Sequence, residues 1–355
     1  MSFAASHSGI AVIGGGVVGL SIAWRLSQLG WQITLFDRQA VGQEASWVGA
    51  GMLAPGGEVS KPTDFARLLL EARSLYRDFV IELHEESGVP IDYQESGGLD
   101  LAYSDHELAG LLTHAATQAR LGIASQPITP ADVRSGWPQV RSAGLSGAIF
   151  YPTDAFVNAR DLVSALKAAC VRRGVHLREG DPVKRVTVDQ TSVGIEASDP
   201  HLLDAAVIAA GAWSSDLPVL GVPPLTAVEP VKGHILGFQQ PPQTCPSIVR
   251  YGDTYLLQRA NGLVLAGASM EHVGFDRAIQ PAVVAALAEK AGSVLPCLAG
   301  HPPEQIWIGF RPASEEIQIG PWHSSRLFVA YGHFRNGILL APLTAARIAA
   351  AVGRH

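Results

Sequence analysis

The stretch IAVIGGGVVGL, residues 10–20, decides the fold of this chain. The apolar residues 10–13 predict a short buried strand, residues 14–16 a turn, and residues 17–29 a helix. A second apolar run at residues 31–36 predicts another strand. Strand, helix and strand together form a βαβ unit, so the chain opens as a doubly wound sheet of Rossmann type.

The glycine spacing in this stretch is that of a dinucleotide-binding turn. Gly14 permits the tight turn, Gly16 lets the backbone approach a pyrophosphate, and Gly19 allows helix and strand to pack closely. The N-terminus of the helix then offers free N–H groups to the phosphates. Asp37 ends the second strand, 18 residues after Gly19, where a carboxylate can bind ribose hydroxyls.

The segment after Asp37 distinguishes between the possible dinucleotides. Residues 44–53, EASWVGAGML, form a predicted loop of small residues that contains Ser46, Gly49 and Gly51. Such a loop can lay its backbone against an extended cofactor, because glycine permits close approach of a ligand. The alternative is an ordinary flexible loop, which Trp47 and Met52 disfavour. This segment, together with a second nucleotide-type motif near the C-terminus, favours FAD over NAD.

The domain organisation follows from where the α/β pattern returns. AAVIAAGAWSSDL and the terminal LFVAYG with NGILLAPLTAARIAAAV again read as strand, glycine turn and helix. The predicted fold class is α/β plus α+β, in which an antiparallel-sheet substrate domain is inserted into a Rossmann-like FAD-binding domain. The predicted ranges are 1–87, 151–220 and 306–355 for the discontinuous FAD-binding domain, and 88–150 and 221–305 for the substrate-binding domain.

Composition narrows the class of function. A chain of 355 residues is long enough for about two domains. Its formal net charge of -6 excludes the basic field that attracts nucleic acid or anionic membranes. The three cysteines, Cys170, Cys245 and Cys297, show no CxxC spacing, which indicates a reducing cytoplasm and no metal site. The N-terminal apolar stretch is broken by glycines and Arg25, so we expect neither signal nor membrane anchor.

A lone cation lies near the C-terminus in GHFRNGILLAP, residues 332–342. The helix expected to begin near Asn336 and Gly337 offers unpaired N–H groups at the carboxyl edge of the sheet, where they could bind the flavin pyrimidine. Arg335 precedes this helix and could hold a substrate carboxylate, the natural partner of a buried guanidinium. The alternative is a structural ion pair with an Asp or Glu of the other domain.

A long amphipathic helix is predicted over residues 64–86. Apolar residues recur at helical spacing along one stripe, which we expect to be core: Phe65, Leu68, Leu69, Ala72, Leu75, Phe79, Val80 and Leu83.

Four motifs carry a resemblance to a known family. GGGVVG, EASWVGAGML, GFRP and above all GHFRNGILLAP resemble the FAD-dependent glycine oxidases of the D-amino-acid oxidase superfamily, enzymes tied to thiamine thiazole synthesis in bacteria. The resemblance covers nearly the whole chain. It implies that Arg311 binds the substrate carboxylate, with Arg335, Tyr255 and Met270 around the substrate. The implied FAD contacts, added to the three fingerprint glycines, are Val17, Val18, Asp37, Arg38, Ala45, Ser46, Ala50, Gly51, Met52, Val183, His333, Phe334, Arg335, Asn336, Gly337, Ile338 and Leu339.

The same resemblance implies the chemistry. A small amine such as glycine, sarcosine or a D-amino acid is oxidised by hydride transfer to flavin, giving an α-keto acid such as glyoxylate, ammonia or an amine, and hydrogen peroxide. Hydride transfer demands no catalytic base, so no residue is assigned that role. His333 is either a base or a satisfied histidine at a strand end, and His234 and Lys232 are left open. Covalent relatives attach flavin through a cysteine near GFRP; none follows Cys297, so non-covalent FAD is expected.

Several alternatives remain open at this point. A bulkier N-substituted glycine, such as an N-carboxymethyl amino acid, is a possible substrate of the same fold. A non-catalytic nucleotide-binding protein would keep the Rossmann unit alone, and an NAD-dependent dehydrogenase would be colourless. Relatives are commonly tetrameric, which implies a homo-oligomer. The expected absence of an anchor favours molecular oxygen over a membrane quinone as electron acceptor.

Overall fold

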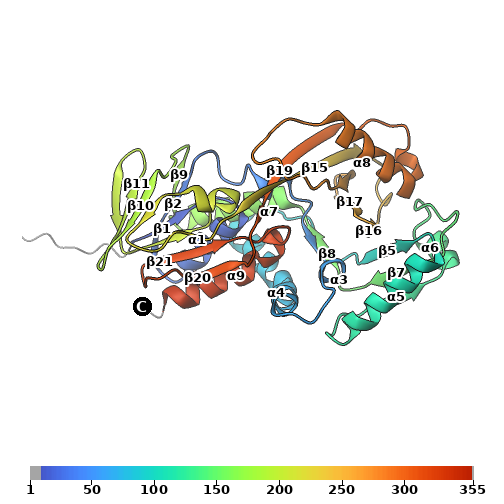
Figure 1. Ribbon diagram of the computed structural model, residues 1–355, viewed down its shortest axis with the longest axis horizontal. Coiled ribbons are helices and arrows are strands. Elements are labelled where there is room, and N and C mark those ends of the chain that lie inside the picture. Colours follow the sequence, from blue (N-terminus) through green and yellow to red (C-terminus); the bar gives the residue numbers. More distant parts are fainter. Residues whose placement is uncertain (1–8, 354–355) are drawn as a thin grey trace, which may run out of the picture.

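A six-stranded sheet forms the centre of one half of the molecule (Figure 1). The computed structural model describes residues 9–353; residues 1–8 and 354–355 of the expected FAD-binding domain lie outside that range. All neighbouring strands are parallel except β20 and β21. The order across the sheet is β20 (Gln318–Pro321), β21 (Leu327–Tyr331), β13 (Ala205–Ile208), β1 (Gly9–Ile13), β2 (Gln32–Asp37) and β9 (His176–Glu179).

The predicted βαβ unit is confirmed, because β1 and β2 pair in parallel on either side of the intervening α1 (Val17–Gln28). Gly14 has a φ of 107°, and a Cβ there would lie 2.4 Å from the Ala209 carbonyl oxygen. A Cβ on Gly19 would lie 1.9 Å from the carbonyl oxygen of Gly14. Only glycine therefore lets α1 approach β1 this closely.

The two faces of this sheet are covered differently. Helices pack on one face: α1, α4 (Asp64–Ser87), α7 (Ala159–Arg172) and α9 (Gly337–Val352). The other face packs against a second, four-stranded sheet through apolar residues of both sheets. Its order is β12 (Pro200–Leu203), β11 (Val193–Glu196), β10 (Arg185–Val188) and β14 (Val219–Leu220).

An eight-stranded sheet forms the other half of the molecule (Figure 1). Its neighbours are antiparallel except β16 and β5, and α8 (Pro281–Val294) packs on one face. This is the predicted inserted antiparallel sheet. The order is β19 (Gln305–Ala313), β15 (Glu229–Gln239), β18 (Leu263–Gly267), β17 (Thr254–Gln258), β16 (Ile248–Tyr251), β5 (Gly98–Ala102), β7 (Gly147–Tyr151) and β6 (Gln126–Ile128).

Sheet membership departs from the expected domain ranges at several places. Tyr151, expected in the FAD-binding domain, ends β7, and β8 of the same expected range pairs with β4 of the expected substrate-binding range. Residues 306–313 were expected in the FAD-binding domain, but they belong to β19 and pair with β15. The remaining elements connect the two halves, where β3, β8 and β4 form a three-stranded sheet, or pack on the eight-stranded sheet. They are α2 (Ala45–Val48), β3 (Met52–Leu53), α3 (Pro55–Glu58), β4 (Tyr93–Gln94), α5 (Asp105–Ala119), α6 (Pro130–Gly136), β8 (Ala155–Val157) and the 3-10 helices η1 (Gly211–Asp216) and η2 (Pro296–Leu298).

The predicted long helix is confirmed as α4, with Thr63 as N-cap and Gly88 in the left-handed conformation at its end. Its buried stripe contains the expected residues except Phe65 and Leu75, whose exposed fractions are 43% and 39%. The prediction for these two is wrong, because Tyr76 rather than Leu75 occupies the fully buried position beside Ala72. The expected loop at 44–53 is also partly wrong, since α2 and β3 lie within it.

No helix among residues 9–353 has both the length and the apolar character that crossing a bilayer requires. No cluster of three or more His, Cys, Asp or Glu side chains in the same range is arranged to hold a metal ion.

Candidate active site

A cavity of about 1100 Å³ lies where the six-stranded and eight-stranded sheets meet. Its wall includes the N-termini of α1 and α9, the segment around α2, the 3-10 helix η1, and parts of β15, β17 and β19. This volume slightly exceeds the usual range for ligand sites, which is about 300–1,000 Å³. The cavity can therefore hold an extended cofactor together with a small substrate.

The N-terminus of α1 forms one end of this cavity. Its N-cap residue Gly16 provides no side-chain cap, and the first turn contains no acidic residue. The Ser46 hydroxyl accepts a hydrogen bond from Val17 N at 2.9 Å, which holds α2 against this helix end. A helix N-terminus with free N–H groups and no competing carboxylate fits a pyrophosphate.

Asp37 lies at the carboxyl end of β2, beside the glycine turn. Its Oδ2 accepts a hydrogen bond from Gly15 N at 2.7 Å and its Oδ1 one from Gln39 N at 2.8 Å. Burial raises the pKa of this carboxyl, against the opposing effect of these two hydrogen bonds. Each oxygen can accept a further hydrogen bond, and Asp37 lines the cavity, so the position fits ribose hydroxyls.

Arg38 and its neighbours close the same end of the cavity. The guanidinium lies 3.6 Å from the ring centroid of Trp213 and pairs with Glu44 at 2.7 Å. Trp213 belongs to η1, directly after the buried strand β13. The expected strand and glycine turn at this point are confirmed, but Trp213 was not identified as a site residue.

The N-terminus of α9 supplies the second set of free backbone donors, because Asn336 makes no side-chain cap. Nearby, His333 Nε2 lies 3.0 Å from the Thr344 hydroxyl. Burial lowers the pKa of His333 to about 4, so the imidazole is neutral at pH 7. Of the two interpretations left open, the satisfied histidine matches these contacts.

Arg311 lies on β19 with its guanidinium over the backbone of Gly233, where a Cβ would come within 2.4 Å of the guanidinium nitrogens. Its Nη1 donates to the Ser269 carbonyl oxygen at 3.0 Å, and no carboxylate among residues 9–353 forms an ion pair with it. Burial lowers the pKa of this guanidinium, and burial raises that of the neighbouring Tyr255 phenol. A half-buried cation without an anion, beside a phenol that stays protonated, fits a small carboxylate.

Arg335 is paired, in contrast to Arg311. Its Nη2 lies 2.5 Å from Glu58 Oε1, at the end of α3. An ion pair was the alternative for this residue, although Glu58 falls within the range expected for the same domain rather than the other one. Met270 also lines the cavity and is 52% exposed.

The predicted site residues converge on this cavity with two exceptions. Gly19 and Leu339 do not line it: Gly19 packs against the Gly14 carbonyl, and Leu339 is buried in the helix layer. The sequence did not identify five further residues of the site or its support, which are Glu58, Trp213, Gly233, Ser269 and Glu271. The Lys232–Gly233 step was an available sequence signal for Gly233, because glycine permits close approach of another group.

Comparison with known proteins agrees with this geometry. The family model described as DAO, FAD dependent oxidoreductase, matches residues 9–351. The glycine oxidase of Geobacillus kaustophilus is 31% identical over 97% of this chain and 93% of its own length. The bifunctional protein ThiO/ThiG of Nostoc is 34% identical over 96% of this chain but only 52% of its own length.

The fold comparison gives the same result. The crystal structure of glycine oxidase from Geobacillus kaustophilus superposes with a TM-score of 0.91, at 31% identity, over 97% of this chain and 94% of that one. The two helix N-termini, Asp37 and the glycine cradle fit FAD as this family's cofactor. This chain is an FAD-dependent oxidoreductase and belongs to the DAO family.

Proposed function

We propose that this enzyme oxidises glycine, and small amines such as sarcosine and D-amino acids, with molecular oxygen as the final electron acceptor. The observation that carries the proposal is Arg311, a guanidinium without a carboxylate partner among residues 9–353, beside Tyr255 in the cavity. The names of the relatives, glycine oxidase in both sequence and structure comparisons, support a small amino acid as substrate.

Each residue of the site then has a defined part. Arg311 and the protonated Tyr255 hold the substrate carboxylate, while Met270 forms a wall and Arg335 lies beside the substrate. Bound FAD would supply the hydride acceptor for oxidation of the substrate at its α-carbon. The protein supplies position and electrostatics, and needs no side chain as base. His333 is held neutral by burial beside Thr344, in agreement with a supporting role.

The overall reaction balances without a further reactant. Glycine, oxygen and water give glyoxylate, ammonia and hydrogen peroxide, because the imine formed by oxidation hydrolyses to the keto acid. We further propose that FAD is held non-covalently by the residues at the two helix N-termini and Asp37. The division into an FAD-binding and a substrate-binding domain is part of the same proposal.

We also propose a cellular setting. Cys170, Cys245 and Cys297 are free thiols, which supports a reducing cytoplasm. Participation in thiamine biosynthesis and assembly into a homo-oligomer, such as a tetramer, stay predictions from the sequence resemblance. Size-exclusion chromatography with light scattering measures the assembly directly.

Anaerobic mixing of the FAD-loaded protein with a panel of amines tests the substrate. We expect glycine or sarcosine to bleach the visible flavin absorbance faster than D-alanine or larger N-alkylglycines. Bleaching by a larger N-alkylglycine alone would instead establish the alternative substrate class. If no amine bleaches the flavin, the oxidase proposal fails and a non-catalytic nucleotide-binding role gains support.

A further inference from the structure

We propose that Lys232 and His234 are positioning residues that fix Arg311 from the opposite face of the sheet, by holding the backbone of Ser269 through Glu271. This inference rests on the proposed role of Arg311 as the carboxylate-binding residue. It concerns two residues that the sequence left without a role and that do not line the cavity.

Strand β15 presents two different faces, because successive side chains point to opposite sides of a sheet. Val231 pairs in register with Arg311 and Gly233 with Gly309, so residue 233 lies beneath the Arg311 guanidinium. Lys232 and His234 therefore point to the other face. Both are fully buried, with exposed fractions of 0%. A buried lysine is stable only when its charge is matched by nearby polar groups.

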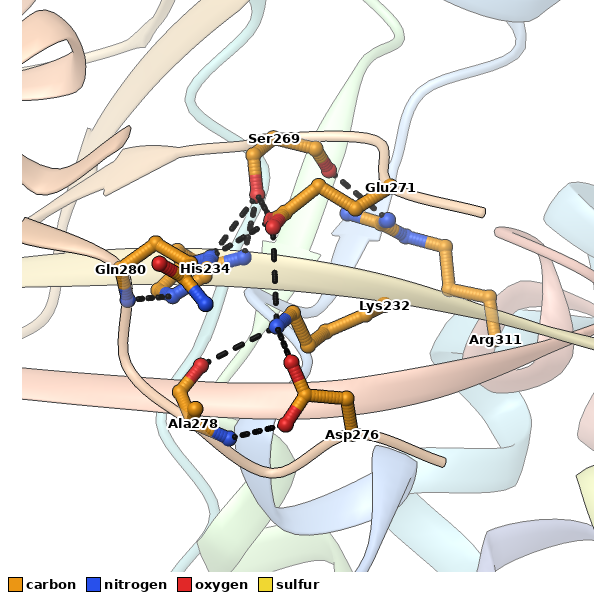
Figure 2. Close-up of polar contacts among 8 residues, drawn as sticks. All are labelled: Lys232, His234, Ser269, Glu271, Asp276, Ala278, Gln280 and Arg311. Carbon is orange, nitrogen blue, oxygen red and sulfur yellow. Dashed lines mark hydrogen bonds and ion pairs between the residues drawn. The ribbon is translucent and has the colours of Figure 1, made fainter. Parts of the chain in front are cut away.

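The partners of Lys232 all lie in one segment, residues 268–280, which joins β18 to α8 and is called here the strap loop. The Nζ atom of Lys232 lies 3.3 Å from Asp276 Oδ2, 3.0 Å from the Ala278 carbonyl oxygen and 3.6 Å from Glu271 Oε2 (Figure 2). The backbones of Lys232 and Glu271 also exchange two hydrogen bonds of 2.9 Å. Lys232 thus joins the outgoing and returning arms of the strap loop.

His234 joins the same two arms at a second point. Its Nδ1 lies 2.8 Å from Glu271 Oε1, and Gln280 N donates to its Nε2 at 3.3 Å. Because Nε2 accepts this hydrogen bond, the ring proton resides on Nδ1 and is donated toward Glu271. Burial works to raise the pKa of Glu271, but hydrogen bonds from Ser269 and His234 and the charge of Lys232 outweigh it and lower the pKa. Glu271 therefore stays a carboxylate.

Ser269 connects this cluster to the cavity. Its hydroxyl donates to Glu271 Oε1 at 2.7 Å and accepts from His234 N at 2.8 Å, while its carbonyl oxygen accepts from Arg311 Nη1 at 3.0 Å (Figure 2). This carbonyl is the hydrogen-bond acceptor that the described residues offer to the Arg311 guanidinium. Rotation of the Ser269 peptide would release Arg311, and the side chain of the same residue prevents that rotation.

The returning arm of the strap loop is also held at a second place, away from Ser269, which provides a matched control. Phe275 stacks on Trp213 with ring centroids 4.7 Å apart, and Arg277 pairs with Glu44 at 2.6 Å. Arg277→Gln should loosen this far end while the hydrogen bonds of Ser269 stay intact. It therefore distinguishes general loosening of the loop from loss of the specific link to Arg311.

The test uses the FAD-loaded enzyme and the pair Ser269→Ala and Ser269→Thr, together with Lys232→Met. Ser269→Ala keeps the carbonyl but removes the hydroxyl that fixes it, whereas Ser269→Thr retains a hydroxyl. We measure KM and kcat for glycine, and Kd for acetate from the flavin absorbance change. Acetate has a carboxylate but no amine, so it reports on Arg311 without turnover.

We expect Ser269→Ala and Lys232→Met to raise KM and the acetate Kd together by about tenfold, with kcat changed by less than about twofold. Ser269→Thr and Arg277→Gln should stay near the original values. The proposal is overturned if Ser269→Ala lowers the melting temperature but leaves both constants unchanged. The Ser269 pair tests the link from this cluster to Arg311 even where Lys232→Met fails to fold, and the acetate titration does so even where glycine is not the substrate.

Discussion

Arg335 and Glu58 form an ion pair in the cavity wall, with Arg335 Nη2 and Glu58 Oε1 2.5 Å apart although 277 residues separate them in sequence. The pair joins the residue just before the N-cap of α9 to the end of α3. Two arginines therefore face the same cavity in different states: Arg335 is matched by a carboxylate, and Arg311 is matched by a carbonyl oxygen alone. This difference makes their contributions to substrate binding separable.

Glu58→Gln should tighten the binding of carboxylates to the FAD-loaded enzyme. Removing the acid leaves Arg335 unpaired, and for a partly exposed pair the effect is modest, about two- to fivefold in the acetate Kd. Glu71→Gln is the matched control, because it breaks the exposed Arg347–Glu71 pair between α9 and α4. An unchanged acetate Kd in Glu58→Gln would show that Arg335 does not contribute to the carboxylate site.

Arg311→Ala should raise KM for glycine by roughly 100-fold, because a charge-assisted contact to the carboxylate is lost. Arg311→Lys should recover only part of this loss, since an ammonium cannot form two parallel hydrogen bonds. Steady-state kinetics with oxygen consumption measure both variants. Arg185→Ala, which removes an exposed pair with Glu196 on the four-stranded sheet, serves as control. Wild-type kinetics in Arg311→Ala would refute the assigned role.

Gly19→Ala should lower both the stability of the fold and the retention of FAD. The added Cβ would lie 1.9 Å from the Gly14 carbonyl oxygen, so α1 must move away from β1 and the phosphate-binding turn opens. Gly110→Ala is the matched control, because this glycine lies in α5 with no atom within 4 Å of the new Cβ. We expect it to stabilise the protein by about 0.5–1 kcal/mol. Thermal unfolding and bound flavin absorbance measure both variants.

His333 should make the stability of the protein depend on pH in a defined window. Burial lowers its pKa from 6.5 to about 4, so between these values the unfolded chain binds a proton that the folded chain does not. Stability is therefore lost as pH falls from 6.5 toward 4, by about 3 kcal/mol from this residue alone. The difference in unfolding free energy between the original protein and His333→Gln, measured by urea titration at several pH values, isolates this contribution. A difference that is constant across the window contradicts the prediction.

The sequence predicts those elements of the structure that are determined by residues close together in the chain. The unit around Gly14 and Gly19 is predictable because glycine spacing, strand and helix lie within 30 residues. The helix at the C-terminus and the free backbone donors near Asn336 follow from a similar local pattern. Most predicted cofactor contacts line the cavity for this reason.

The parts that the sequence does not predict depend on distant partners. Nothing near Arg335 indicates that Glu58 is its counterion, and no pattern within the strap loop indicates that it surrounds Lys232. The exposure of Phe65 and Leu75 likewise depends on which parts of α4 pack against neighbouring elements. The spacing of apolar residues predicts which face of a helix is buried. Tertiary packing decides how many residues at the edges of that face are also buried.

The alternation of side chains along β15 makes this strand intolerant of insertions and deletions. A shift of one residue would exchange its faces, moving a lysine beneath the Arg311 guanidinium and a glycine into the core of the strap-loop contacts. Two like charges would then meet where a glycine now admits the guanidinium. Substitutions along the strand change one face at a time, but a change in its length would disable substrate binding and loop anchoring in a single step.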